Sequence, residues 1–169
     1  GLRGGGREAL ARGGDIAGSH DFVSDDGGLT WTPIASIAGE GIYGPPIVTS
    51  LVVDPQSSNT LYAGTTIPGF IAHIPDTGLL SKSTDRGHSW QPLLSIDGEF
   101  GGVQQLLVDE GSSQTIFAIA NHQLHVSRDA GATWSVLPID ALFVESLAQD
   151  SANPSMLIAA TGSQGFYRT

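Results

Sequence analysis

The sequence lacks cysteine altogether and is poor in basic residues. With no cysteine, neither a disulfide framework nor a thiolate-bound metal is possible. Lys and Arg number 7 against 17 Asp and Glu, which gives a net charge of −10. Nucleic acids and anionic membrane surfaces require clustered Lys and Arg, so this balance argues against both as partners. No apolar run reaches the length of a membrane span, and no signal-peptide core is present in the chain.

Glycine is abundant where charge is scarce. The 169 residues include 23 glycines, and charged residues make up only 14%. A chain of this length forms one domain or part of one, and this composition is typical of a turn-rich all-β protein. We expect residues 1–7, which are rich in glycine, to form a flexible N-terminal segment. Residues 8–169 then form the folded domain.

One eight-residue pattern, S-x-D-x-G-x-[TS]-W, occurs three times, at 24–31, 83–90 and 127–134. Repeats about 40–60 residues apart are typical of propeller blades. The glycines suit tight turns with positive φ, and the aspartates and serines can bond to the turn backbone. The indoles supply apolar area at the start of the next strand. The defining residues are Ser24, Asp26, Gly28 and Trp31, then Ser83, Asp85, Gly87 and Trp90, then Ser127, Asp129, Gly131 and Trp134.

This pattern resembles the Asp-box, or BNR repeat, of sialidase-like, xyloglucanase-like and photosystem-assembly-factor-like β-propellers. The resemblance implies that the box aspartates have a structural role at the blade periphery, away from any ligand. A calcium site at Asp25 and Asp26 is the alternative, but the spaced oxygen ligands of a calcium loop are absent.

The stretches between the boxes predict the remaining strands of four-stranded antiparallel blades, with positions A to D in chain order. The ranges 47–53, 60–66, 78–84 and 89–95 form one blade, and 102–108, 115–121, 123–128 and 133–139 form the next. Strands A to C of a further blade are 144–149, 155–161 and 165–169, and strands B to D of a preceding blade are 8–13, 20–24 and 29–36. The fold class is therefore an all-β partial propeller of two complete and two incomplete blades. Since propellers close with four to eight blades, we expect further blades from the same parent chain or from another subunit.

This topology sorts the connections onto two faces. The A–B turns at 54–59, 109–114 and 150–154 lie with the Asp-boxes on what we call the box face. The B–C and D–A connections form the loop face, where ligands of similar propellers bind. The B–C loop 66–77 is longer than its counterparts, a feature often associated with function. Ligand-binding candidates on the loop face are Glu40, Tyr43, Phe70, His73, Asp76, Asp97, Glu99 and Phe100. Carboxylates beside aromatic rings suit sugar binding, whereas the alternative is that the rings fill gaps between blades and the acids are solvated.

Catalysis has one candidate residue. The segment 12–18 resembles the stretch that holds the catalytic-base aspartate of xyloglucan-active propeller hydrolases, matching at Arg12, Asp15, Ile16 and Gly18. Gly14 and Ala17 depart from that pattern. Glycoside hydrolysis requires two flanking carboxylates, and the resemblance places the acid partner in a second propeller. A sialidase site requires three arginines for the substrate carboxylate, and this chain does not supply them on the loop face.

We expect neither a metal nor a cofactor. His122 and His125 have no third ligand nearby in the sequence, and as strand residues three apart they would point to opposite faces. The expected function is a non-catalytic binding or assembly surface for a glycan or protein partner, without nucleic acid or membrane insertion. The alternative is a fragment of a propeller glycoside hydrolase with Asp15 as its base. The expected location is extracellular or at the cell surface.

Overall fold

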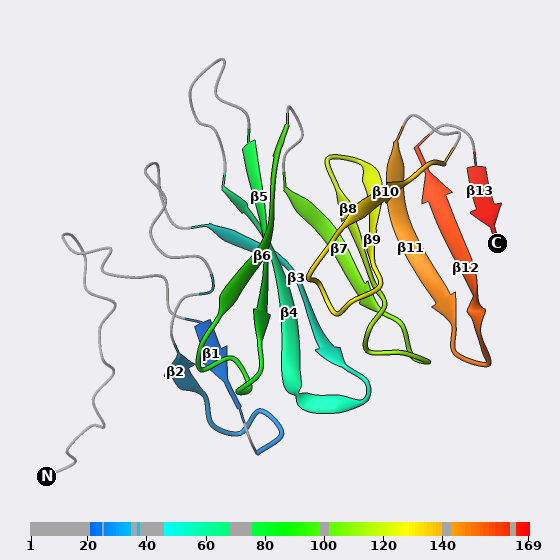
Figure 1. Ribbon diagram of the computed structural model, residues 1–169. Helices are drawn as coiled ribbons and strands as arrows, with labels where there is room; N and C mark the ends of the chain where they lie inside the picture. The colour runs from blue at the N-terminus through cyan, green and yellow to red at the C-terminus, as the bar shows by residue number, and fades with distance from the viewer. Residues whose placement is uncertain are drawn as a thin grey trace, which may run out of the picture.

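The computed structural model describes residues 21–24, 26–34, 37, 46–67, 76–98, 102–139, 143–162 and 165–169. Within them lie thirteen strands and no helix, arranged in four antiparallel sheets (Figure 1). The first sheet pairs β1 (Asp21–Val23) with β2 (Thr32–Ile34). The second contains β3 (Ile47–Asp54), β4 (Ser57–Ile67), β5 (Asp76–Ser83) and β6 (Gln91–Gly98). The third contains β7 (Val103–Val108), β8 (Ile116–Ala120), β9 (Gln123–Ser127) and β10 (Ser135–Leu137). The fourth contains β11 (Val144–Asp150), β12 (Asn153–Thr161) and β13 (Gly165–Arg168).

Each sheet is a meander in which consecutive strands are neighbours. This is the blade topology expected from the sequence, with β3, β7 and β11 as A strands. The D strands begin later than predicted, at Gln91 and Ser135 instead of 89 and 133. The reason is that the last box residues bond to the box aspartate and not to the neighbouring strand. The strand expected at 8–13 lies outside the described residues.

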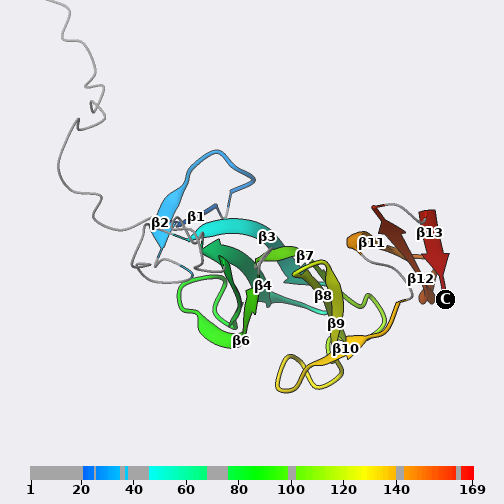
Figure 2. The same cartoon turned by 90° about the horizontal axis from the view of Figure 1, so that it is seen from above.

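The sheets stand side by side around an arc, and they do not close into a ring (Figures 1 and 2). The A strands lie next to one another, since β7 contacts β3 on one side and β11 on the other. The strand β8 (Ile116–Ala120) shows how packing between two sheets is reflected in the sequence. Its five residues are all buried, because a neighbouring sheet covers each of its faces. A strand buried on both faces has an unbroken apolar sequence in place of an alternating one.

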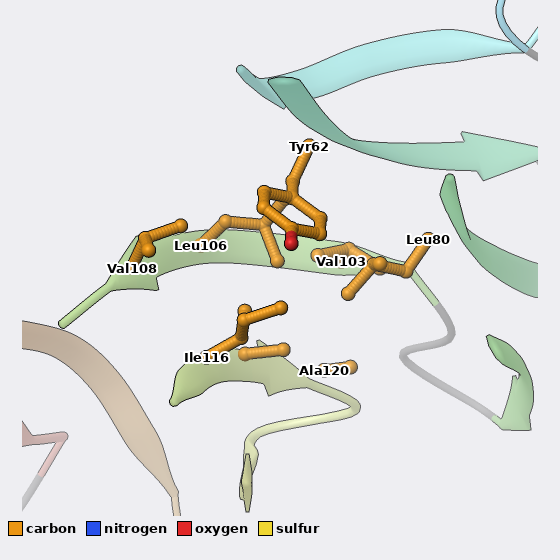
Figure 3. Packing of buried hydrophobic residues seen from close by; sticks show 8 residues of the cluster. Tyr62, Leu80, Val103, Leu106, Val108, Ile116 and Ala120 are labelled. Atoms are coloured by element: carbon orange, nitrogen blue, oxygen red, sulfur yellow. The ribbon is translucent and has the colours of Figure 1, made fainter. Parts of the chain in front are cut away.

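Two apolar clusters hold the sheets together. The first fills the space between the β3–β6 and β7–β10 sheets, and its fully buried members include Tyr62, Leu80, Val103 and Ile116 (Figure 3). The second lies between the β7–β10 and β11–β13 sheets. It is formed by Phe117, Ile119, Leu124, Val126, Val144, Leu147 and Ala159. Burial, together with the negative charge of Asp54, raises the pKa of Tyr62 to about 12, so its hydroxyl stays neutral.

Glycine permits the closest approach between two sheets. A Cβ atom at Gly64 in β4 would collide with the side chain of Val103 in β7. A Cβ atom at Gly78 in β5 would lie 2.9 Å from the backbone of Gly102. An added Cβ atom at either glycine would lie closer to the next sheet than van der Waals contact allows, so any larger residue would push the two sheets apart.

The A strands share an irregularity near their first residues. Pairing between β3 and β4 skips Thr49, pairing between β7 and β8 skips Gln104, and pairing between β11 and β12 skips Glu145. Each skipped residue is the extra residue of a β-bulge, which bends the strand and redirects its side chain. The residues after the first two bulges, Ser50 and Gln105, link neighbouring sheets through their side chains. Ser50 Oγ accepts the N–H of Leu106 at 3.0 Å, and Gln105 Oε1 accepts that of Leu147 at 2.8 Å.

The box tryptophans differ in their packing, and this difference leads to a stability prediction. Trp134 is half-buried against the first cluster and donates its indole N–H to Gly131 O at 3.0 Å. Trp31 occupies the same motif position but is 61% exposed. We expect Trp134→Ala to lower the free energy of unfolding by about 2–3 kcal/mol, less than for a fully buried tryptophan. Trp31→Ala is the matched control and should cost under about 1 kcal/mol. Urea unfolding of both variants is the measurement, and equal losses would contradict the packing described here.

Candidate functional site

The three Asp-boxes make the same set of hydrogen bonds. In the third box, Ser127 Oγ donates to Asp129 Oδ1 at 2.7 Å and accepts the N–H of Gly131 at 2.8 Å. The other partner of Asp129 is Thr133, which donates its N–H at 2.8 Å and its hydroxyl at 2.6 Å. The first and second boxes repeat these bonds around Asp26 and Asp85. In all three, the carboxylate therefore bonds to its own turn.

These bonds keep the box carboxylates ionised. The pKa values of Asp26, Asp85 and Asp129 are each lowered to about 2. The largest cause in each case is the hydroxyl donated by the last Thr or Ser of the box, followed by the backbone N–H of that same residue. A carboxylate that accepts several hydrogen bonds is stabilised in its charged form.

The box turn requires two residues with positive φ, where the sequence pattern marks only one. In the second box φ is 61° at Arg86 and 87° at Gly87, and in the third it is 56° at Ala130 and 95° at Gly131. Consecutive residues of this kind form a type I′ turn, whose twist matches a β-hairpin. The first box has glycine at both positions. The backbone at Arg86 and Ala130 is therefore held in the left-handed conformation, which is strained for a residue with a Cβ atom.

The acidic residues of the A–B turns on the box face also serve the fold. Asp54 accepts the N–H of Gln56 at 2.9 Å and the hydroxyl of Ser113, in the next sheet, at 2.6 Å. Asp109 accepts the N–H of Gly111 at 2.7 Å, and Asp150 that of Ala152 at 2.8 Å.

The described basic residues gather at the same face. Arg86 and Arg128 belong to boxes, and Lys82 Nζ lies 3.4 Å from Ala130 O in the third box. Arg168 is the last residue of β13. On the box face, Lys82 and Arg86 thus bond to neighbouring turns.

On the loop face, two predicted ligand residues lie on paired strands, with their side chains on opposite faces of the sheet. Asp76 begins β5 and Asp97 stands near the end of β6, where Thr77 and Asp97 are register partners. Thr77 Oγ1 donates to Asp97 Oδ1 at 2.8 Å, and the Asp97 side chain remains exposed. The other candidates lie outside the described residues. They are Asp15, Glu40, Tyr43, Phe70, His73, Glu99 and Phe100.

A second group on the loop face joins the third and fourth sheets. His122, in the β8–β9 turn, places its Nδ1 3.6 Å from Glu145 Oε1, and its ring meets that of Phe143 edge to face at 5.0 Å between centroids. The backbone carbonyl of His122 accepts the N–H of Val144 at 2.9 Å, which ties the turn to β11. Phe143 is 41% exposed, and half of the Glu145 side chain is exposed.

Phe143 and Glu145 are absent from the residues predicted as ligand-binding. A signal for Glu145 was available in the sequence. In each A strand two polar residues separate the apolar residues that flank them, as in Val144-Glu145-Ser146-Leu147. Such a break in the period of two is the expected trace of a bulge. Phe143 and His122 carry no such signal, because their proximity comes from the packing of two sheets.

The described residues contain no group of three His, Asp or Glu side chains arranged to hold a metal ion. His122 lies in a turn and not in a strand, so the expectation of two strand residues facing opposite ways was wrong in its premise. His125 is buried in β9, where burial lowers its pKa. No helix able to cross a membrane occurs among the described residues.

Comparisons with known proteins agree with this geometry. The model of the BNR/Asp-box repeat family matches residues 22–33, the first box and its flanking strands. The chain is a partial β-propeller that carries Asp-box repeats. A search of curated proteins finds no match for it. The propeller segment is similar to an ancestral GH74 enzyme, with 26% identity over 78% of this chain and a TM-score of 0.56.

Two further solved structures share the fold at lower identity. A structure of YCF48 bound to D1 peptide matches 89% of this chain with 16% identity and a TM-score of 0.57. Sqt1 from Chaetomium thermophilum matches 79% with 17% identity and a TM-score of 0.52. The segment covers 15% of the GH74 enzyme, 46% of YCF48 and 34% of Sqt1.

The strained box turn gives a test of the box geometry. Replacing Ala130 with glycine removes the Cβ atom from a left-handed position, so Ala130→Gly should raise the free energy of unfolding by about 1 kcal/mol. Ala132→Gly is the matched control: Ala132 is an exposed residue of the same turn without positive φ, and there glycine only adds backbone freedom to the unfolded chain. Chemical denaturation should therefore move the two variants in opposite directions. Destabilisation of both would contradict the assigned turn.

Proposed function

We propose that this propeller segment is a non-catalytic binding or assembly surface for a glycan or protein partner on its loop face. One observation carries the proposal. Each box aspartate accepts several hydrogen bonds from its own turn, as Asp129 does, whereas the exposed Asp97 of the loop face accepts one from Thr77, and the half-exposed Glu145 lies near Phe143 on the same face. Exposed polar and aromatic side chains on loops that a rigid scaffold positions are typical of binding sites. The same proposal places the protein outside the cell or at its surface.

Binding to panels of β-glucan and xyloglucan oligosaccharides and to a peptide array tests this function. We expect at least one panel member to bind without being cleaved. Asp97→Asn on the loop face should weaken that binding about threefold or more, because the carboxylate is an exposed recognition group. Glu110→Gln is the control, since it removes one charge from an exposed residue of the box face.

Two results would contradict the proposal. One is binding weakened by Glu110→Gln and not by Asp97→Asn, which would move the site to the box face. The other is release of shorter oligosaccharides by the chain itself, which would make the segment catalytic.

The alternative is a piece of a propeller glycoside hydrolase in which Asp15 is the catalytic base. The 26% identity with the ancestral GH74 enzyme favours it. On this alternative, Asp15→Ala in the parent protein lowers the rate of xyloglucan or β-glucan hydrolysis about 100-fold or more, as loss of a general base does. An unchanged hydrolysis rate would remove Asp15 from the mechanism.

A further inference from the structure

A turn with two residues of positive φ holds His122 on the loop face. Asn121 and His122 connect β8 to β9 with φ of 49° and 57°. Two-residue turns with positive φ at both positions favour Asn-Gly, because a Cβ atom at the second position clashes with the backbone. A histidine with positive φ at this position is unfavourable for the fold, and strained residues of this kind gather at functional sites.

A bulge presents the partner of His122. Glu145 is the skipped residue in the pairing of β11 with β12, at the position that Thr49 holds in β3. Thr49 donates its hydroxyl to the Gly64 and Val103 carbonyls, so its bulge serves the contact between sheets. Glu145 has a half-exposed carboxylate close to His122. The bulge in β3 therefore contributes to packing between sheets, whereas the equivalent bulge in β11 presents an ionisable side chain to solvent.

Phe143 completes the group from the residue before β11. Its ring meets the imidazole of His122 at an interplanar angle of 79°, and its carbonyl accepts the N–H of Gly162 at 3.2 Å. Beside His122 lies a cavity of about 140 Å³, lined also by Leu137, Pro138, Ile139 and Val144. The carboxylate of Glu145 and the exposed ring of Phe143 thus both lie beside His122, which also lines the recess.

We propose that His122, Phe143 and Glu145 bind an arginine or lysine side chain of an extended segment of a protein partner. Glu145 accepts the hydrogen bonds of the cation, as a carboxylate does from a guanidinium fork. Phe143 offers its ring to the same cation. His122 is a positioning residue that holds the carboxylate and the ring against each other. This assignment rests on the proposed function and gives its loop face a class of ligand.

The negative charge of the loop face favours a cationic ligand over a neutral glycan. The whole chain carries −10, and Asp76 and Asp97 stand on the loop face with Glu145. Among the described residues, the basic side chains of Lys82, Arg86, Arg128 and Arg168 belong to the box-face end of their strands or to the boxes themselves. A face with this sign attracts cations and speeds their association, and a neutral sugar gains nothing from it.

Two capped pentapeptides, Gly-Gly-Arg-Gly-Gly and the same sequence with citrulline for arginine, test the assignment. Citrulline keeps the shape of the side chain and removes its charge. Titration followed by NMR shifts of the His122, Glu145 and Gly162 amides should show the arginine peptide binding at least about threefold more tightly. Equal affinities would overturn the proposal.

Glu145→Gln should remove this discrimination between the two peptides, while Glu110→Gln, with the same loss of charge on the box face, should retain it. His122→Asn keeps a residue that tolerates positive φ and removes the ring. It should reduce the ratio of the two peptide affinities while thermal unfolding stays cooperative. If His122 only stabilised the fold, the substitution would alter unfolding and not this ratio. Discrimination that survives Glu145→Gln would overturn the assignment. If the peptides fail but Asp97-dependent binding to the panels holds, only the ligand class is wrong, and the proposed function stands.

Discussion

The burial of the β7–β10 sheet between its two neighbours is the interaction on which the rest of the structure depends. Neither face of β8 is exposed, and the apolar clusters on its two sides contain most of the buried apolar side chains among the described residues. A single blade cannot bury both faces by itself, so each blade gains stability only from the next, as in other repeat architectures. The same logic explains why an apolar side chain such as Phe166, in the last of the four sheets, is still exposed.

This packing also separates structure from recognition. The turns of the box face are held by their own Asp and Ser side chains and linked from sheet to sheet by bonds such as Ser113 to Asp54. The loop face receives the other ends of the same strands and presents the exposed Asp97 and the half-exposed Glu145. A scaffold made rigid at one end can carry variable side chains at the other without loss of stability.

The bulges near the start of the A strands connect these two roles. All three break the pairing at the same position, yet Thr49 bonds to the adjacent sheet whereas Glu145 stands beside His122 with half of its side chain exposed. The bulge is thus repeated in each A strand, but the residue at the bulge differs from strand to strand. The backbone geometry is common to the repeats, and the bulge residue determines which interactions each copy can make.

The strands, their order and the bonding of each Asp-box follow from the sequence alone. The box bonds join residues of one motif, so Ser127–Trp134 contains the partners that its aspartate needs, and the alternation of strands and turns repeats from blade to blade. Packing between sheets sets which indole is buried and which side chains meet on the loop face. Trp31 and Trp134 have the same motif and different exposure, since Trp134 packs against the cluster between two sheets and Trp31 is 61% exposed. His122 and Glu145 lie in different sheets and meet only because packing places the β8–β9 turn against β11, a contact that no local pattern encodes.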